Sequence, residues 1–151
     1  MNPDFRDLLR ALCDAEARFL VIGAYAVSIH AEPRATGDLD IWVEPTAENA
    51  RRVYAALQRF GAPLHDLTVG DLAVTDVVFQ IGLPPRRIVI LTSITGVTFA
   101  EAWPDRVEAT YGDVRFPVIG LGALLRNKQA LARPKDLLDI DLLRRRAPKG
   151  S

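Results

Sequence analysis

Hydrophobic and polar residues follow two different periods along the chain, and these predict where helices and strands lie. Apolar residues recur at helical spacing in residues 4–18 and 47–60, which predicts helices that bury one face. Further helices are expected at residues 24–31, 98–103, 121–132 and 134–146. Short apolar or alternating runs predict strands at residues 19–23, 39–43, 77–82, 87–92, 107–111 and 114–118.

Residues that favour helix ends stand at several of these boundaries. Thr46 precedes the helix over residues 47–60 and Gly61 follows it. Pro134 suits the first turn of the last helix, because the N–H that it lacks has no partner there. The order of the elements predicts an α/β (mixed α+β) fold, with a mixed sheet flanked by helices and two helices at the C-terminal end. We expect a single domain over residues 1–151.

The composition is that of an ordinary globular protein, with 49% apolar and 25% charged residues. No apolar run approaches the roughly 18 residues that a transmembrane helix needs, and no apolar signal core follows the N-terminus. We therefore expect a cytoplasmic protein without membrane contact. Cys13 is the only cysteine, which excludes an internal disulfide and a cysteine-based zinc site.

The formal net charge is zero, but it is unevenly distributed. Residues 126–149 contain eight Lys or Arg against three Asp, a net charge of +5. Residues 1–125 contain eleven Lys or Arg against sixteen acids, a net charge of −5. A basic segment beside an acidic body can attract a phosphate-bearing ligand, although a solvated helix face gives the same pattern.

Two aspartates point most directly to chemistry. Asp38 and Asp40 are two positions apart, so on a strand both side chains face the same side while Leu39 and Ile41 face the core. Neighbouring carboxylates repel each other, and a divalent ion such as Mg²⁺ relieves this repulsion and bridges to substrate phosphates. A solvated strand face is the alternative interpretation. Gly23 lies at a strand–helix junction fifteen residues earlier, where backbone can approach a phosphate.

The ordered combination of Gly23, a short helix and the Asp-Leu-Asp strand resembles the nucleotidyltransferase superfamily, whose sites pair a glycine-led helix with an Asp-x-Asp strand. Within that superfamily, the chain looks most like small bacterial proteins related to the AbiEii-type toxins. The resemblance runs over residues 22–140, in the stretches GAYAVSIHAEPRATGDLDIWV, IGLPPRRIVILTSITGV, FAEAW and RNKQALARPKDLLDI.

The resemblance implies transfer of a nucleoside monophosphate from a nucleoside triphosphate to an acceptor, such as RNA, a protein or a small molecule. It also implies an antitoxin-type protein partner. Asp38 and Asp40 would form the catalytic pair and hold Mg²⁺ (or Mn²⁺) on the triphosphate. The residues implied in nucleotide binding are Gly23, Ala24, Tyr25, Arg34, Thr36, Lys128 and Lys135, and Arg133 is a further basic candidate.

Four positions around the aspartate pair affect how a phosphate or a base could bind. Ala24 stands where such families usually have a second Gly or a Ser, so a hydroxyl contact to phosphate is lost. Arg34 and Thr36 either steer phosphate or order the loop ahead of the acids. Trp42 shares the face of Asp40, where it either stacks on a base or, as we expect, packs in the core.

The chain departs from the superfamily pattern at the third acid. Related proteins carry a third carboxylate on a later strand, in a pattern like R-I-D-x-L-T, whereas this chain has Val89 at that place. Valine binds no metal and accepts no proton, so part of a two-metal mechanism is missing. Three hypotheses follow: a Mg²⁺-dependent transferase, a degenerate protein that still binds Mg²⁺–nucleotide, and one partner of a toxin–antitoxin pair.

Overall fold

The computed structural model describes residues 2–32 and 37–146. Its helices are α1 (Pro3–Asp14), α2 (Gly23–His30), α3 (Ala47–Phe60), α4 (Val69–Leu72), α5 (Phe99–Ala102), α6 (Leu121–Leu131) and α7 (Pro134–Arg146), with a 3-10 turn η1 (Trp103–Asp105) after α5. Its strands are β1 (Phe19–Ile22), β2 (Leu39–Val43), β3 (Val78–Ile81), β4 (Ile88–Leu91), β5 (Val107–Tyr111) and β6 (Val114–Val118).

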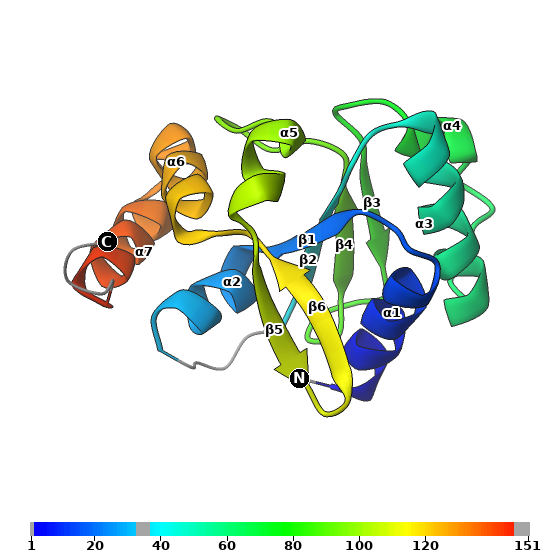
Figure 1. The fold of residues 1–151 in the computed structure, drawn as a ribbon, viewed down its shortest axis with the longest axis horizontal. Coiled ribbons are helices and arrows are strands. Elements are labelled where there is room, and N and C mark those ends of the chain that lie inside the picture. The colour runs from blue at the N-terminus through cyan, green and yellow to red at the C-terminus, as the bar shows by residue number, and fades with distance from the viewer. Residues whose placement is uncertain (1, 33–36, 147–151) are drawn as a thin grey trace.

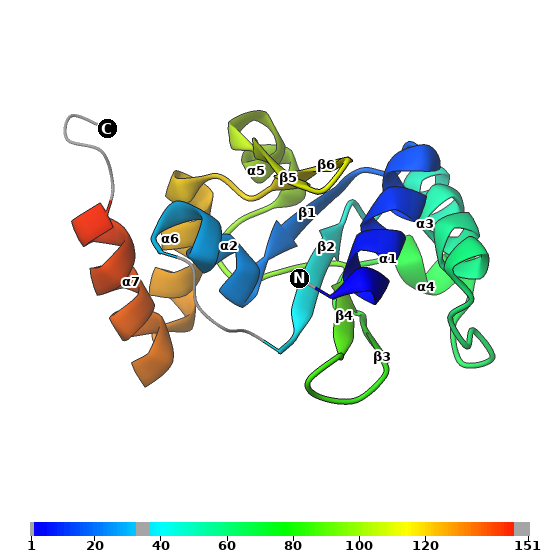
Figure 2. The same cartoon turned by 90° about the horizontal axis from the view of Figure 1, so that it is seen from below.

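The six strands form one mixed sheet in the order β3-β4-β2-β1-β6-β5. The pairs β2–β4 and β1–β6 are parallel, and the other neighbours are antiparallel. Figures 1 and 2 show the sheet between two groups of helices, with α1, α3 and α4 at one end and α2, α6 and α7 at the other. The predicted mixed sheet flanked by helices is therefore confirmed.

The helix that opens the chain shows how the pattern becomes structure. The Asn2 side chain caps α1 by accepting a hydrogen bond from the Phe5 N–H. One face of α1 then buries Phe5, Leu8, Leu9 and Leu12. The predicted end at residue 18 was wrong, because α1 stops at Asp14 and Glu16 takes a left-handed conformation with φ 57°. The short helix α4 was not predicted.

The strand β2 separates the core from the polar side of the sheet. Leu39, Ile41 and Val43 are fully buried, as their alternation predicts. On the face of Asp40, Trp42 is also buried, and its ring lies 5.1 Å from that of Phe99 at an edge-on angle. Trp42 therefore packs in the core, as we expected, and is not available to a base.

Among the described residues, no helix combines the length and the hydropathy that crossing a membrane requires.

Candidate active site

Asp38 and Asp40 lie at the edge of the cleft between the sheet and the C-terminal helices. Asp40 sits in β2, paired with Ile22 of β1 on one side and with Val89 of β4 on the other. Asp38 immediately precedes this strand. Both side chains are half-buried, and both line two adjoining hollows of about 470 and 390 Å³. In the structure the two carboxylates thus share one solvent-reachable cleft.

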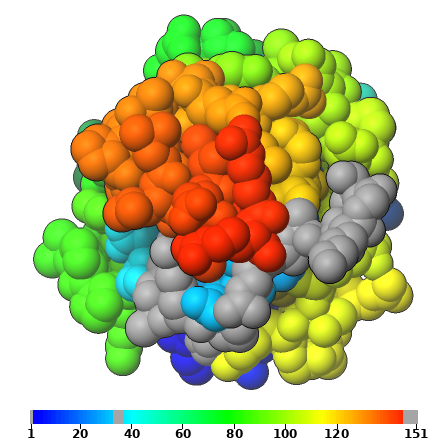
Figure 3. All heavy atoms as spheres, turned by 90° about the vertical axis from the view of Figure 1, so that its left-hand side faces the viewer, coloured from blue at the N-terminus to red at the C-terminus, as the bar shows by residue number. Residues whose placement is uncertain are grey.

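The helices α6 and α7 close one side of this cleft. Figure 3 shows them, in orange to red, across the face of the molecule that lies at the left of Figure 1. Lys128 of α6, Lys135 of α7 and Arg133 between these helices line both hollows, together with the two aspartates. The excess positive charge of the C-terminal segment is therefore directed in part into the cleft.

Gly23 brings backbone against the Asp40 carboxylate. Its φ is +69°, and a Cβ atom placed on it would overlap Asp40 Oδ2. Only glycine satisfies both constraints, since other residues rarely adopt this φ and all carry a Cβ. The helix α2 begins at this residue, and its N-cap residue Ile22 provides no capping side chain. Its first backbone N–H groups are therefore open to an anion in the cleft.

The two residues after Gly23 differ in direction. Ala24 lines the 470 Å³ hollow together with Gly23. Tyr25 is absent from the lining of both hollows, and its ring packs edge-on against Phe5 of α1, with centroids 5.8 Å apart. Burial raises the pKa of its hydroxyl. The other two residues implied in phosphate binding, Arg34 and Thr36, lie outside the described residues.

The electrostatics of the aspartate pair favour a bound cation. Burial raises the pKa of Asp40, and the neighbouring charge of Asp38 raises it further. Lys135, Arg87 and Lys128 act in the opposite direction. Two half-buried carboxylates that repel each other, beside a glycine that leaves room, form a donor set that suits a hard divalent ion. The residues present thus fit one Mg²⁺ or Mn²⁺.

Arg87 was not among the residues that sequence reasoning selected. Its Nη2 atom donates a hydrogen bond to Asp38 Oδ2 over 2.6 Å. The sequence could have indicated this residue. Arg87 lies two positions before Val89 in the strand predicted at residues 87–92, so both side chains face the same side.

Lys128 and Arg133 form ion pairs with carboxylates of α7. The ammonium of Lys128 donates to Asp136 and to Asp139, over 3.2 and 3.1 Å. Arg133 Nε donates to Asp136 over 2.6 Å, and these bonds, led by the one from Arg133, lower the pKa of Asp136 to about 2. In the described part of the chain, Lys135 forms no such ion pair.

Val89 lies where the sequence placed the missing acid. It is the direct partner of Asp40 in the parallel β2–β4 ladder, and its side chain lines the 390 Å³ hollow. Within residues 2–32 and 37–146, no three His, Cys, Asp or Glu side chains gather so that they could hold a metal ion. In that part of the chain, Asp139 is the one further carboxylate in the lining of the two hollows, and it accepts a hydrogen bond from Lys128.

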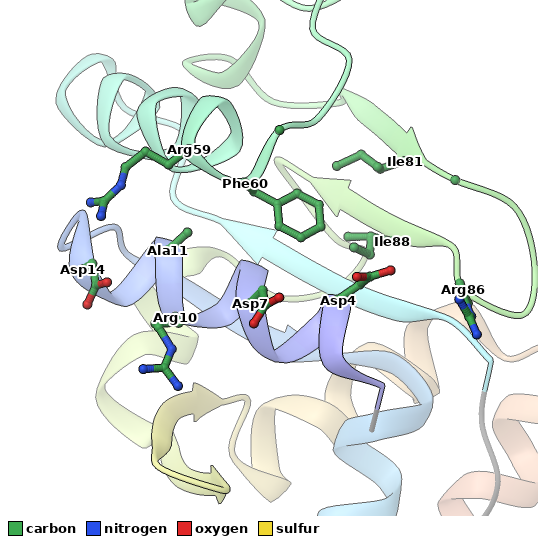
Figure 4. A pocket seen from close by; sticks show the side chains of 12 residues that line it. Asp4, Asp7, Arg10, Ala11, Asp14, Arg59, Phe60, Ile81, Arg86 and Ile88 are labelled. Carbon is green, nitrogen blue, oxygen red and sulfur yellow. The ribbon is translucent and has the colours of Figure 1, made fainter.

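Another hollow, of about 610 Å³, lies on the other side of β4, against α1 and the end of α3 (Figure 4). Its floor includes Phe60 and Ile88, and its rim carries Arg10 and acids of α1, together with Arg59 and Arg86. Asp38 and Asp40 are not part of its lining. We therefore place the candidate site in the cleft between the sheet and the helices α6 and α7.

No protein-family model matches the chain, and no curated protein sequence matches it. Solved structures do. Lincosamide antibiotic adenylyltransferase LnuA with lincomycin bound is 14% identical, with a TM-score of 0.60 over 95% of this chain and 96% of that one. A proposed nucleotidyltransferase from Thermotoga maritima is 13% identical, with a TM-score of 0.57 over 96% and 93%. The antibiotic-resistance factor ANT(2'')-Ia is 13% identical, with a TM-score of 0.63 over 93% and 80%.

These similarities extend over nearly the whole chain, and at this level of identity they define its fold. The chain has the nucleotidyltransferase fold.

Proposed function

We propose that the chain binds a nucleoside triphosphate together with one divalent ion and transfers its nucleoside monophosphate to an acceptor hydroxyl. The observation that carries this proposal is the placement of Asp38 and Asp40 on one lip of the cleft, with the uncapped start of α2 beside them. The shared fold of the structural neighbours supports the same reaction class.

The two hollows suggest where each substrate lies. The 470 Å³ hollow holds the start of α2 and Lys135, which suit the phosphates. The 390 Å³ hollow adds Val89 and Gln80, which face each other across β3 and β4 and suit an acceptor. A bound Mg²⁺ would supply charge neutralisation between the carboxylates and the triphosphate.

The transfer step itself meets an obstacle at Val89. The acceptor oxygen forms a bond to the α-phosphorus, the bond from that phosphorus to the bridging oxygen breaks, and pyrophosphate leaves with that electron pair. The hydroxyl proton must go to a base, and Val89 offers none. This favours a second candidate function, in which the chain binds Mg²⁺–nucleotide without efficient transfer.

Calorimetry with non-hydrolysable nucleoside triphosphates tests the binding half of the proposal. We expect binding with Mg²⁺ and none with a chelator, because the phosphates and the carboxylates are both anionic. Asp38→Asn and Asp40→Asn should each abolish it, whereas the exposed Asp66→Asn serves as a matched control and should bind normally. Equal affinity in the presence of the chelator would refute the metal-bridged site.

Transfer of a labelled nucleotide separates the two candidate functions. We expect low transfer by the natural chain and higher transfer after Val89→Asp, once an acceptor is supplied. Since a new half-buried acid is costly without a partner, folding of this variant is checked with and without Mg²⁺. Robust transfer by the natural chain, unchanged by Val89→Asp, would show that another group takes the part of the third acid.

The finer resemblance to AbiEii-type toxins leads to a separate proposal, a protein partner of the antitoxin kind. It is supported by Leu137 and Leu138 on α7, of which Leu138 is 73% exposed and lines the 470 Å³ hollow. Exposed apolar side chains beside a cleft favour protein contact. Co-expression with a candidate antitoxin tests it: we expect a complex on size exclusion that Leu138→Asp abolishes, and no complex would refute it.

A further inference from the structure

A positive side chain stands beside the place of the missing third acid. Arg87 immediately precedes β4, and its carbonyl accepts a hydrogen bond from the Leu39 N–H over 3.0 Å. This bond fixes its backbone next to the start of β2. Because Arg87 and Val89 are two positions apart, they face the same side, and both line the 390 Å³ hollow with Asp38 and Asp40.

The contact between Arg87 and Asp38 is short and partly shielded from water. Nη2 lies 2.6 Å from Asp38 Oδ2, and the two side chains are 33% and 31% exposed. Arg87 Nε is buried without a hydrogen-bond partner among the described residues. A guanidinium keeps its charge at every accessible pH and holds a carboxylate in a fixed geometry.

We propose that Arg87 supplies the second positive charge of this site, in place of a second metal ion that a third carboxylate would recruit. This inference rests on the proposed function, because it assigns the charges of the same site. Val89 removes one negative ligand, whereas Arg87, which matches the Arg of the R-I-D-x-L-T pattern, keeps its positive charge against Asp38. A second divalent ion would thus lack a ligand and meet a cation, so the site takes one divalent ion.

Two roles of Arg87 can be distinguished: competition with metal for the carboxylates, as proposed, or simple orientation of Asp38. They predict opposite changes in metal affinity when Arg87 is replaced. If Arg87 competes with metal for the carboxylates, removing its charge must strengthen metal binding. If Arg87 only orients Asp38 as a ligand, removing it must weaken metal binding. The affinity for metal therefore distinguishes the two roles without any measurement of transfer.

The neighbouring residue provides a matched control. Arg86 carries the same charge one position earlier, but its exposed side chain lines the 610 Å³ hollow on the other side of β4, where Figure 4 shows it at the edge. Arg86→Gln therefore changes the net charge as Arg87→Gln does, without altering the candidate site. Arg87→Lys keeps the charge in place.

The experiment is titration of the full chain with Mn²⁺ alone, with free Mn²⁺ followed by electron paramagnetic resonance. We expect one Mn²⁺ per natural chain and an affinity raised about tenfold by Arg87→Gln, the effect of one unit charge a few ångströms away. Arg86→Gln and Arg87→Lys should stay near the natural value. The double variant Arg87→Gln/Val89→Asp should bind a second Mn²⁺. Circular dichroism confirms that each variant is folded.

Two results would overturn this inference alone: two Mn²⁺ bound by the natural chain, or weaker Mn²⁺ binding by Arg87→Gln than by Arg86→Gln. A natural chain that binds no Mn²⁺ at all would instead overturn the proposed function, and this inference with it.

Discussion

The buried carboxylate of Asp136 links the two C-terminal helices, and its removal should destabilise the fold in a pH-dependent way. Asp136 is 0% exposed and receives hydrogen bonds from Lys128 of α6 and from Arg133 just before α7. The variant Asp136→Asn keeps the size of the side chain but removes its charge. Among the described residues, Lys128 then retains Asp139 as its one charged buried partner.

The size of the effect follows from the pKa of Asp136. Its folded-state pKa of about 2 lies below the ordinary value of 3.8. At about 1.4 kcal/mol per pKa unit, the ionised carboxylate stabilises the fold by about 2 kcal/mol at neutral pH. For a chain of this length, such a loss lowers the melting temperature by roughly 4–8 °C.

The sign of the pH dependence is fixed by the direction of this shift. A lowered folded-state pKa stabilises the protein above the unfolded-state pKa, and the gain is lost as the pH falls through the folded-state pKa. The contribution is thus complete above about pH 5, about half remains at pH 3, and little remains near pH 2. The difference between Asp136→Asn and the natural chain should shrink over that range.

Urea unfolding at pH 7, 5, 4 and 3 measures this difference. Asp141→Asn is the matched control, because Asp141 lies on the same helix in an exposed ion pair with Arg145, and it should change stability little at any pH. A destabilisation by Asp136→Asn that stays constant from pH 7 to pH 3 would show that packing, and not the ionised carboxylate, stabilises the helix pair.

Three further outcomes are expected. Gly23→Ala should lose Mg²⁺–nucleotide binding and be less stable than the control Gly112→Ala. Both glycines have positive φ, of 69° and 60°, but an added Cβ meets Asp40 only at Gly23. Gly112→Ala should therefore bind normally and cost about 1–2 kcal/mol in urea unfolding. Asp40→Asn should raise the free energy of unfolding at pH 7 without metal, because it removes a half-buried charge that Asp38 repels. Of the two proteins, only the natural chain should gain stability from Mg²⁺ with a non-hydrolysable triphosphate. Lower stability of the metal-free variant would contradict this reasoning. Lys135→Gln should weaken triphosphate binding in calorimetry and reduce its salt dependence, whereas Arg144→Gln, outside both hollows, should do neither.

The sequence was a good guide to the sheet and to the cleft. The alternation in residues 39–43 predicts β2 with Leu39 and Ile41 in the core, and the spacing of Asp38 and Asp40 predicts that they share a side. These features follow from the alternation of side chains between the two faces of a strand, which holds for any sequence. The partner of Asp40 on β4 came from the resemblance, which placed Val89 beside the aspartates.

Pairings between distant residues could not be predicted from local patterns. The resemblance implied that Lys128 binds nucleotide, but its burial was not predicted: α7 folds back and brings Asp136 and Asp139 against it. The ion pair of Arg87 with Asp38 likewise joins residues 49 positions apart. Tyr25 follows the glycine that opens α2, but the turn of the helix directs its ring toward Phe5.

The charges of the cleft are balanced overall and separated in space. Within the described residues, its lining and the layer behind it hold the four acids Asp38, Asp40, Asp136 and Asp139 and the four cations Arg87, Lys128, Arg133 and Lys135. Asp136 and Asp139 form ion pairs with Lys128 and Arg133. This leaves negative charge at Asp38 and Asp40, on one side of the cleft, and positive charge at Lys135, on the other.

A ligand with the same separation of charge suits this cleft best. A bare triphosphate is repelled by the carboxylates of Asp38 and Asp40, and a bare metal ion binds these carboxylates against the charges of Arg87 and Lys135, so the metal ion binds more weakly alone than together with the triphosphate. A metal–triphosphate complex places its cation on the lip and its phosphates toward α2 and Lys135. Binding of the two components should therefore be reciprocal: the factor by which Mg²⁺ raises affinity for the triphosphate equals the factor by which the triphosphate raises affinity for Mg²⁺.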